Sequence, residues 1–468
     1  MRGCRESGSA VRVGAALLAS LSFGVVGHAS AATLEWALVQ AYQNNPQLNA
    51  QRASVRATDE SVPQALSGYR PKVSVTATLG VQNTRTLSVS SSGGTTLAEG
   101  DFAPHGVGVT ASQTLFNGFQ TANRTRLAEG QVSSAREALR VLEQTVLLNA
   151  ATVYMDMLRD TAIVDVQRSN VRVLNETLRQ TRDRFNVGEV TRTDVAQSEA
   201  QLASGQYQLL NAESNLTTTR SNFRRVIGVE PNNLTPAAPV DRFAPRTLAA
   251  AIGLGLDQNP TVTAAMYGID VANLQIKINE GALYPTVTLS GTAQKNWENS
   301  LTQLEQTSYS AITSLTMPIY QGGSEYSLIR QSKESLAQQR LSFEQIRDQA
   351  RQSVAQAWGQ VQATKAQIEA AQAQVRSSET ALNGVREEAR VGQRTTLDVL
   401  NAQQALVNAR VTLVTAQRDR VVASYNLLNA VGILSPLTLG LPTPVYDPRV
   451  HYHQVRDSWV GLRTPDGK

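Results

Sequence analysis

Two matching polar motifs are the residues of this 468-residue chain best suited to chemistry. The pattern Val-Gly-x-x-Thr-x-x-Asp-Val occurs twice, with its glycine, threonine and aspartate at Gly188, Thr191 and Asp194 and again at Gly392, Thr395 and Asp398. A threonine three residues before an acid is typical of a capping box, so we expect each aspartate to cap the start of a helix. Each glycine suits the left-handed position that ends the preceding helix. The motifs therefore predict two tight helical hairpins.

Patterns of enzymatic chemistry are absent from the sequence. After the N-terminal segment the histidines are His105, His451 and His453, and Cys4 is the sole cysteine. No nucleophile elbow, P-loop, dinucleotide fingerprint or HExxH motif occurs. His451 and His453 offer half a metal site, and exposed tail histidines are the favoured interpretation. We predict that the protein is not an enzyme and has no cofactor or metal.

The N-terminal segment predicts export from the cytoplasm. Three arginines accompany an apolar stretch, 13–26, and small residues that suit cleavage follow at 29–31. We interpret 1–32 as a signal peptide, so the mature chain has no thiol and no disulfide. The net charge of +5 is dispersed along mixed-sign segments, which indicates solvated helix faces and no nucleic-acid surface.

Beyond this segment the chain is an internal duplication. Asn45-Pro46 matches Asn259-Pro260, and further along the two copies of the Val-Gly-x-x-Thr-x-x-Asp-Val pattern match each other. We predict two units, 33–240 and 247–440, and a tail, 441–468. Each unit is expected to contain a helix, two strands and a long helical hairpin.

The long hairpins are predicted at 119–228 and 323–432. A continuous helix over 119–185 would be about 100 Å long at 1.5 Å per residue, which is typical of a coiled coil. Apolar residues recur there at spacing seven, with a neighbouring seam beside them: Val132, Leu139, Val146 and Val153, with Ala135 and Leu142. Many other seam positions are Ala or Gln, a composition compatible with helices set around a hollow.

Four strands are predicted, at 72–82, 106–116, 286–294 and 308–320. Each alternates apolar residues with Ser, Thr and Gly over about ten residues, which fits a membrane barrel with a wet interior. A soluble sandwich is the alternative, but no bulky apolar residues remain to form its second layer. The segment 83–104 is interpreted as an enlarged loop on the extracellular side.

Four strands leave open edges that hydrocarbon does not tolerate, so we expect the barrel to be shared between chains. Two chains would give eight strands and three would give twelve, and strand spacing does not choose between them. Aromatic residues at the helix–strand joins form an interfacial girdle or pack ordinarily at chain corners: Tyr69, Phe116, Tyr284 and Tyr320.

Five stretches resemble the TolC family of outer-membrane efflux channels: AYQNNPQL (41–48), VPQALSGYRPKVS (62–74), LFNGF (115–119), FNVGEVTRTDVAQSEAQL (185–202) and VGQRTTLDVLNAQQAL (391–406). The first two stretches are most similar to members that serve type I protein secretion. The resemblance implies a mainly α-helical fold with a small β part. It also implies a homotrimer, in which twelve strands complete one barrel and twelve helices form a periplasmic tunnel closed at the hairpin tips.

The resemblance also assigns roles at the tips. Asp194 and Arg394 fall where the family holds its entrance shut by polar links between helices, and Asp398 falls where acids ring the aperture. Two residues depart from a well-known member, because Ala389 replaces a tyrosine of the closing network and Asn401 replaces a second ring acid. This entrance is therefore expected to carry one acid ring and a looser latch.

The predicted function is a trimeric channel in the cell outer membrane of a Gram-negative bacterium. By resemblance it exports proteins or small toxic compounds together with a periplasmic adaptor and an inner-membrane ABC or proton-driven transporter. Type I secretion is favoured and multidrug efflux is the alternative. A structural trimeric coiled-coil surface protein is a different class, but returning hairpins and a second pair of strands argue against a fibre. Outer-membrane lipid is an expected partner and nucleic acid is not.

Overall fold

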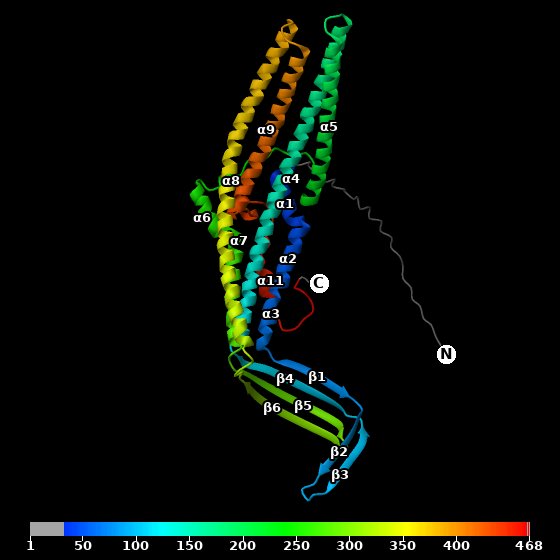
Figure 1. The fold of residues 1–468 in the computed structure, drawn as a ribbon, viewed down its shortest axis with the longest axis vertical. Coiled ribbons are helices and arrows are strands. Elements are labelled where there is room, and N and C mark those ends of the chain that lie inside the picture. The colour runs from blue at the N-terminus through cyan, green and yellow to red at the C-terminus, as the bar shows by residue number, and fades with distance from the viewer. Residues whose placement is uncertain (1–31, 466, 468) are drawn as a thin grey trace, which may run out of the picture.

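The computed structural model describes residues 32–465 and Gly467 and shows an elongated molecule. Long helices run along most of its length, a β-sheet lies at one end and two hairpin turns lie at the other (Figure 1). The predicted signal peptide, 1–32, lies outside the described residues except for Ala32. None of the helices in the described ranges carries an apolar stretch long enough to cross a membrane.

The elements of the first repeat are α1 (Leu34–Asn44), α2 (Pro46–Asp59), α3 (Ser61–Leu66), the 3-10 helix η1 (Ser67–Tyr69), β1 (Lys72–Leu79), β2 (Gln82–Val89), β3 (Thr95–Phe102), β4 (His105–Asn117), α4 (Gln120–Asn186) and α5 (Arg192–Ile227). After η2 (Asp241–Phe243), the second repeat has α6 (Leu248–Gln258), α7 (Pro260–Gly281), β5 (Thr286–Ser300), β6 (Gln303–Thr316), α8 (Ser324–Arg390) and α9 (Thr396–Val431). Two short helices follow, α10 (Pro436–Leu439) and α11 (Arg449–Val455). The predicted fold class, mainly helical with a small sheet, is confirmed.

The long helices α4 and α8 have 67 residues each, and their return helices α5 and α9 have 36 each. At 1.5 Å per residue the longer pair spans about 100 Å. The seven-residue seam of α4 faces other helices, since Val132, Leu139 and Val146 are almost fully buried. The apolar stripe therefore packs this long helix against its neighbours.

An Asn-Pro pair breaks the first helical segment of each repeat and ties it to the long hairpin. The Oδ1 atoms of Asn45 and Asn259 accept backbone N–H bonds from the helix that begins with the following proline. Their Nδ2 groups donate to carbonyls one residue before the ends of α5 and α9, at 3.3 Å to Val226 O and 3.0 Å to Ala430 O. Each asparagine is thus a helix cap and a tertiary link, at matching positions of the two repeats.

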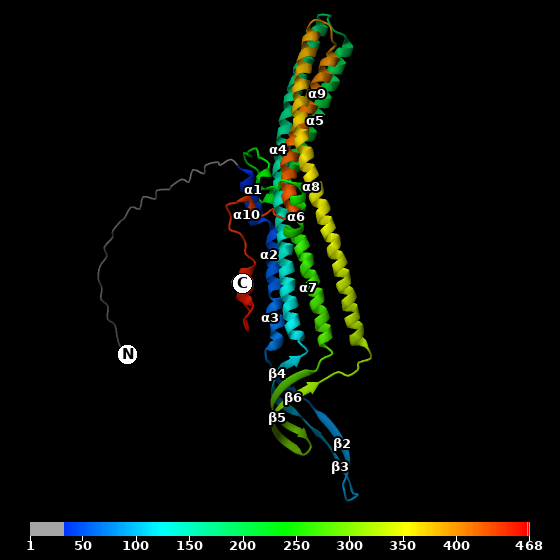
Figure 2. The same cartoon turned by 90° about the vertical axis from the view of Figure 1, so that its left-hand side faces the viewer.

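The four main strands form one antiparallel sheet in the order β1-β4-β5-β6. The register pairs the apolar residues of one strand with those of the next, for example Val75 with Val109 and Ala293 with Tyr309. Every residue of β1 is exposed, and Figure 2 shows no second layer of the described chain over the sheet. The sheet therefore keeps two bare faces and two unpaired edges, β1 and β6.

The segment 83–104 is not a loop, so this expectation was wrong. It forms the hairpin β2–β3, which continues β1 and β4 beyond a break at Gly80 and Pro104, where Gly80 N donates to Pro104 O at 2.9 Å. The segment alternates β-favouring residues on both sides of the Gly93-Gly94 turn, and this signal was overlooked. The first strand accordingly ends at Leu79 and not at 82.

The other strand bounds also differ from those expected. β4 extends one residue further at each end, and β5 continues to Ser300 where 294 was predicted. β6 begins at Gln303 and ends at Thr316, so the predicted strand 308–320 is displaced. Pro318 explains its end, because proline has no N–H to donate to a ladder.

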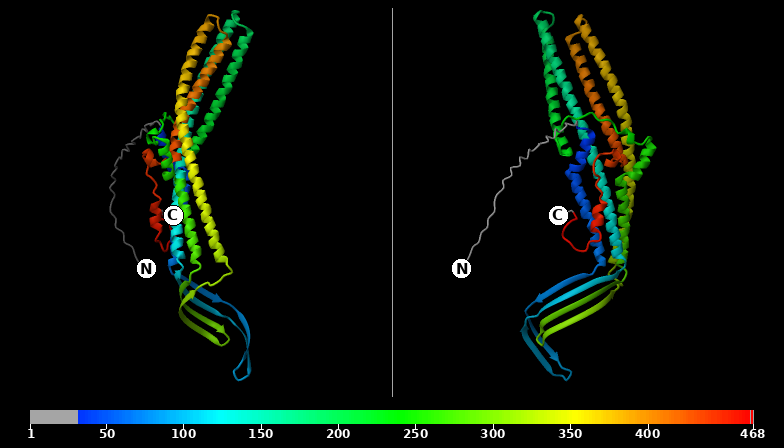
Figure 3. Two further views of the ribbon diagram at one scale, coloured as in Figure 1. Left: turned by 60° about the vertical axis from the view of Figure 1, so that its left-hand side comes forward. Right: turned by 180° about the vertical axis from the view of Figure 1, so that it is seen from behind.

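The tail folds back along the first repeat, where α11 lies beside α2 (Figure 3). His451 is buried, with Nδ1 3.1 Å from Asp59 Oδ2, and Arg136 Nη2 lies 3.6 Å from the other carboxylate oxygen. The interpretation of both tail histidines as exposed was therefore wrong for His451, whereas His453 is exposed. Burial raises the pKa of the Asp59 carboxyl against the opposing effect of His451 and Arg136.

A half-buried acid on α4, Glu143, makes a pH-dependent contribution to stability. Burial raises the pKa of Glu143 to about 7, although Arg52 and Arg140 lower it in part. Because the folded state holds this proton more tightly than the unfolded chain, stability should fall as pH rises from about 4.3 to about 7.

Glu143→Gln should therefore stabilise the protein at pH 8 by on the order of 1–3 kcal/mol and leave it nearly unchanged at pH 4. Thermal unfolding of wild type and variant across this range measures the difference. Glu176→Gln, on the same helix, is the matched control, because the Glu176 side chain is half exposed and its replacement should not change stability in this pH-dependent way. Equal stabilisation by Glu143→Gln at both pH values would contradict the assignment.

Candidate functional site

The two hairpin tips are built in the same way from the repeated motif. α4 ends at Asn186 and α8 ends at Arg390, and the glycine of each turn has a positive φ, 80° at Gly188 and 77° at Gly392. Only glycine adopts this backbone readily, so it allows the chain to leave the helix within one turn. The return helix begins a few residues later in both repeats.

Both aspartates close capping boxes, as predicted. Thr191 N donates to Asp194 Oδ2 at 2.9 Å, and Asp194 N donates back to Thr191 Oγ1 at 3.4 Å. The equivalent distances between Thr395 and Asp398 are 3.0 and 3.2 Å. The pKa of Asp194 is lowered mainly by the Thr191 side chain, and that of Asp398 mainly by the Thr395 backbone N–H. Both acids are therefore negatively charged at neutral pH.

Arg394 is held inside its own hairpin. Its Nε lies 2.8 Å from Glu388 Oε2, and this pairing raises the pKa of the arginine. The first tip has a corresponding pair, in which Arg184 Nη2 lies 2.7 Å from Glu189 Oε1. Within the described chain no hydrogen bond or ion pair joins Arg394 to Asp194. The latch inferred from resemblance is thus not formed within one chain and stays a prediction for an assembled state.

A cavity of about 830 Å³ nevertheless brings most of the predicted residues together between the two tips. It is lined by both turns and by all four hairpin helices, and the predicted residues among its lining are Thr191, Asp194, Ala389, Gly392, Arg394 and Thr395. Gly188, Asp398 and Asn401 do not line it. Five arginines and three carboxylates line the cavity, so its walls have an excess of positive charge.

Polar links between the hairpins, below the tips, were missed by sequence reasoning. Gln201 Nε2 donates to Gln404 Oε1 at 3.1 Å and connects α5 with α9. Gln403 accepts from Arg386 at 3.1 Å and donates to Asn170 at 3.4 Å, which connects α8, α9 and α4. Amide residues on buried seam positions were the available signal, because a coiled coil tolerates them there only when they are paired.

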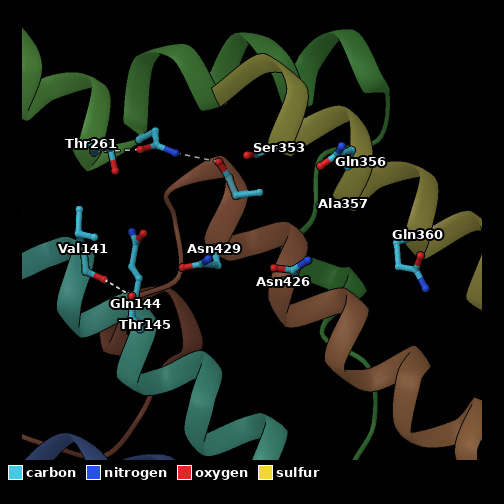
Figure 4. A pocket seen from close by; sticks show the side chains of 12 residues that line it. Val141, Gln144, Thr145, Thr261, Ser353, Gln356, Ala357, Gln360, Asn426 and Asn429 are labelled. Carbon is cyan, nitrogen blue, oxygen red and sulfur yellow. Dashed lines mark hydrogen bonds between the residues drawn. The ribbon is translucent and has the colours of Figure 1, made fainter. Parts of the chain in front are cut away.

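A second polar cavity lies at mid-length, where α4, α7, α8 and α9 meet. Its volume is about 420 Å³, and its lining carries no charged side chain. Figure 4 shows Gln144, Asn426 and Asn429 on one side and Gln356 and Gln360 on another. Gln144 Nε2 donates to Gly432 O at 2.6 Å, so part of this lining fastens α4 to the end of α9.

Histidine, cysteine, aspartate and glutamate side chains do not gather in groups of three or more that would hold a metal ion anywhere in 32–465. The arrangement at the tips is instead a charged opening between four helix ends. Its character is electrostatic, because Arg184 and Arg394 are ion-paired within their hairpins and Asp194 and Asp398 cap helices.

Comparison with known proteins gives a consistent result. The sequence profile of the family described as outer membrane efflux protein matches residues 37–229 and 251–433, one segment for each repeat. The outer membrane efflux protein BepC of Brucella suis is 40% identical over 93% of this chain and 93% of its own. The alkaline protease secretion protein AprF of Pseudomonas aeruginosa is 24% identical over 71% of this chain and 70% of its own. The Campylobacter jejuni CmeC outer membrane channel shares the fold, with a TM-score of 0.76 at 16% identity over 91% of this chain and 89% of that one.

Removing either capping threonine should loosen one tip. Thr191→Ala and Thr395→Ala should each cost about 1 kcal/mol locally, because the first turn of α5 or α9 loses its acceptor. Hydrogen exchange of those amides should then become roughly fivefold faster. The stabilisation that each ionised aspartate contributes should be complete above the ordinary Asp pKa of about 3.9. It should be lost as the pH falls through the lowered pKa of the aspartate in the folded state.

Thr191→Ser and Thr395→Ser are the matched controls, since serine keeps the accepting hydroxyl. Wild-type exchange in both alanine variants would show that the boxes do not hold the tips.

Proposed function

The chain belongs to the outer membrane efflux protein family, and from this premise we propose that three copies assemble into one channel that exports cargo through the outer membrane. The observation that carries the proposal is the four-stranded sheet with two bare faces and two open edges. Backbone groups along such edges cannot stay unpaired in hydrocarbon, so β6 of one copy would pair with β1 of the next. The bare faces suit a lipid-facing exterior and an aqueous interior.

The number of copies follows from the width of the barrel that they would close. Two copies would give eight strands, and an eight-stranded barrel is only wide enough to be filled by its own side chains. Three copies give twelve strands, which leaves room for a water-filled passage. The face that would line it carries small and hydroxyl side chains such as Ser74, Thr76 and Thr110.

The long hairpins of three copies would continue this passage as a periplasmic tunnel with its entrance at the tips. The tip cavity, with its positive excess and four contributing helices, fits the ends of helices from a periplasmic adaptor. The adaptor would in turn link the channel to an inner-membrane transporter of the ABC or proton-driven class. Returning hairpins also disfavour a structural coiled-coil fibre, because a fibre does not need to bring its chain back.

For the cargo, small compounds and proteins are both supported by specific relatives. The 40% identity to a protein named for efflux favours small toxic compounds, and the similarity to a protein named for alkaline protease secretion supports type I protein secretion. The transporter that co-purifies with the channel distinguishes them, since a proton-driven pump indicates efflux and an ABC exporter of proteins indicates secretion.

Purified protein in detergent should be a trimer by native mass spectrometry and should give single-channel currents in planar bilayers, where micelles without protein give none. The trimer should persist without any disulfide, because noncovalent pairing of strands across the open edges and packing of the hairpins hold it. A stable monomer with protected amides along the outer edges of β1 and β6 would contradict the shared barrel. Trimers that conduct no current would contradict the channel.

A latch between Asp194 and Arg394 of adjoining tips would keep the entrance closed. Arg394→Ser and Asp194→Asn should then each raise single-channel conductance several-fold with an unchanged yield of trimer; asparagine retains an acceptor for the cap. Asp398→Asn should instead weaken cation selectivity, since its charge would face the aperture.

Glu388→Gln is the matched control for the latch, because it removes the ion pair within the hairpin and leaves Arg394 free to reach Asp194. Wild-type conductance in Arg394→Ser would place the latch elsewhere. An equal rise in Glu388→Gln would assign closure to the pair within the hairpin.

A further inference from the structure

A cavity of about 830 Å³ lies where the helices meet the sheet, far from the hairpin tips. It is open to solvent and is lined by the start of α4, the end of α7, the first turns of α8 and the segment after β6. Toward this end of the molecule α8 diverges from α7, as Figure 2 shows. The proposed export function makes no use of this cavity, although Gly118 and Phe119 of the stretch LFNGF (115–119) line it.

One part of the cavity wall is cationic. Arg126, Lys277 and Lys333 line it, with Glu280 as the one acid among the lining residues. Lys333 lies 3.9 Å from Glu280, and both side chains are about half exposed. Arg126 and Lys277 have no ion-pair partner within 32–465. Two cations are therefore left over after the single acid is paired, a charge suited to a phosphate group.

The other part of the wall is apolar and solvent-accessible. The exposed fractions are 66% for Phe119, 54% for Tyr284 and 53% for Met317. Large apolar side chains exposed together around a cavity indicate a binding surface. A free phosphate would make no favourable contact with these apolar side chains. A molecule with both a phosphate and a hydrocarbon chain would contact the cationic and the apolar part of the wall.

Phe119 is held there at a conformational cost. Its φ is 60°, in the left-handed region, and it stands directly before the first residue of α4. The matching position of the second repeat is Gly323, with a φ of 84°, so the backbone conformation belongs to the repeat and glycine is its ordinary occupant. The first repeat keeps an exposed aromatic ring in its place, packed edge-on against Phe116.

The position of the cavity along the molecule, and the face of the sheet that it adjoins, both suit contact with membrane lipid. It begins where β4 ends and α4 starts, which is the periplasmic boundary of the membrane if the sheet forms the barrel. Met317 continues the apolar register of β6, in which Tyr309, Ala311 and Leu315 share one face. That face is the one expected to contact lipid.

We propose that this cavity binds an anionic phospholipid of the periplasmic leaflet, and this rests on the proposed function for the position of the membrane. Arg126, Lys277 and Lys333 hold the phosphate, and Phe119, Tyr284 and Met317 contact the first part of the acyl chains. Each protomer binds one lipid, which fastens α8 to α7 at the junction of barrel and tunnel.

Native mass spectrometry of delipidated trimers titrated with dioleoyl-phosphatidylglycerol tests this. We expect up to three bound lipids per trimer, at least tenfold weaker binding of dioleoyl-phosphatidylcholine, and no displacement by 10 mM inorganic phosphate. The double variant Lys277→Gln/Lys333→Gln should weaken phosphatidylglycerol binding at least tenfold. Arg340→Gln/Arg376→Gln is the control, since it removes two exposed charges from α8 outside the cavity and should bind as wild type.

Unchanged binding in the lysine variant, equal binding of the two lipids or displacement by free phosphate would each overturn the proposal. Single-channel recording in neutral bilayers separates it from the export function. The lysine variant should conduct as wild type, whereas altered ion selectivity would show that the cavity opens to the lumen and would also overturn it. Absence of current in wild type would count against the channel and leave the lipid titration to decide this site.

Discussion

The hydrogen bonds of Asn45 and Asn259 are the contacts on which the long architecture depends. Each asparagine caps a helix with its oxygen and fastens the last turn of α5 or α9 with its nitrogen. The 67-residue helices α4 and α8 extend well beyond the ends of the shorter return helices α5 and α9, and they do not themselves determine where those helices end. The asparagine sets that level in both repeats, and the following proline begins a new helix without leaving an unsatisfied N–H. The region where α4, α7, α8 and α9 converge is thereby kept in one geometry.

From that level the molecule extends in two directions with different requirements. Toward the tips the helices are joined by paired amides and ion pairs, such as Gln201 with Gln404 and Asp156 with Arg418 at 2.8 Å. Such contacts remain favourable beside water and can be exchanged for others, which suits the entrance that we propose at the tips. Toward the sheet every β1 residue is exposed, so the chain alone does not bury the surface that its sequence makes apolar. In the channel that we propose, assembly and lipid supply that burial.

The duplication has produced two hairpins with the same backbone and different surroundings. Both tips have a glycine turn, a capping box and an ion pair within the hairpin. Only the first repeat carries the β2–β3 extension and an aromatic residue at the left-handed position before its long helix. Only it receives the tail, through Asp59, Arg136 and His451. In the channel that we propose, the shared features form the tube, whereas the β2–β3 extension and the tail contacts set the first repeat apart from the second.

The sequence by itself determined the features that depend on neighbours within a few residues. The capping boxes at Thr191 and Thr395, the glycine turns and the seven-residue seam through Val132 and Leu139 follow from local geometry, and the duplication repeats them. Contacts between distant residues were decided by the tertiary structure alone. His451 lies 392 residues from Asp59, and Gln201 lies 203 residues from Gln404, because the packing of whole helices sets those distances and no local pattern encodes them.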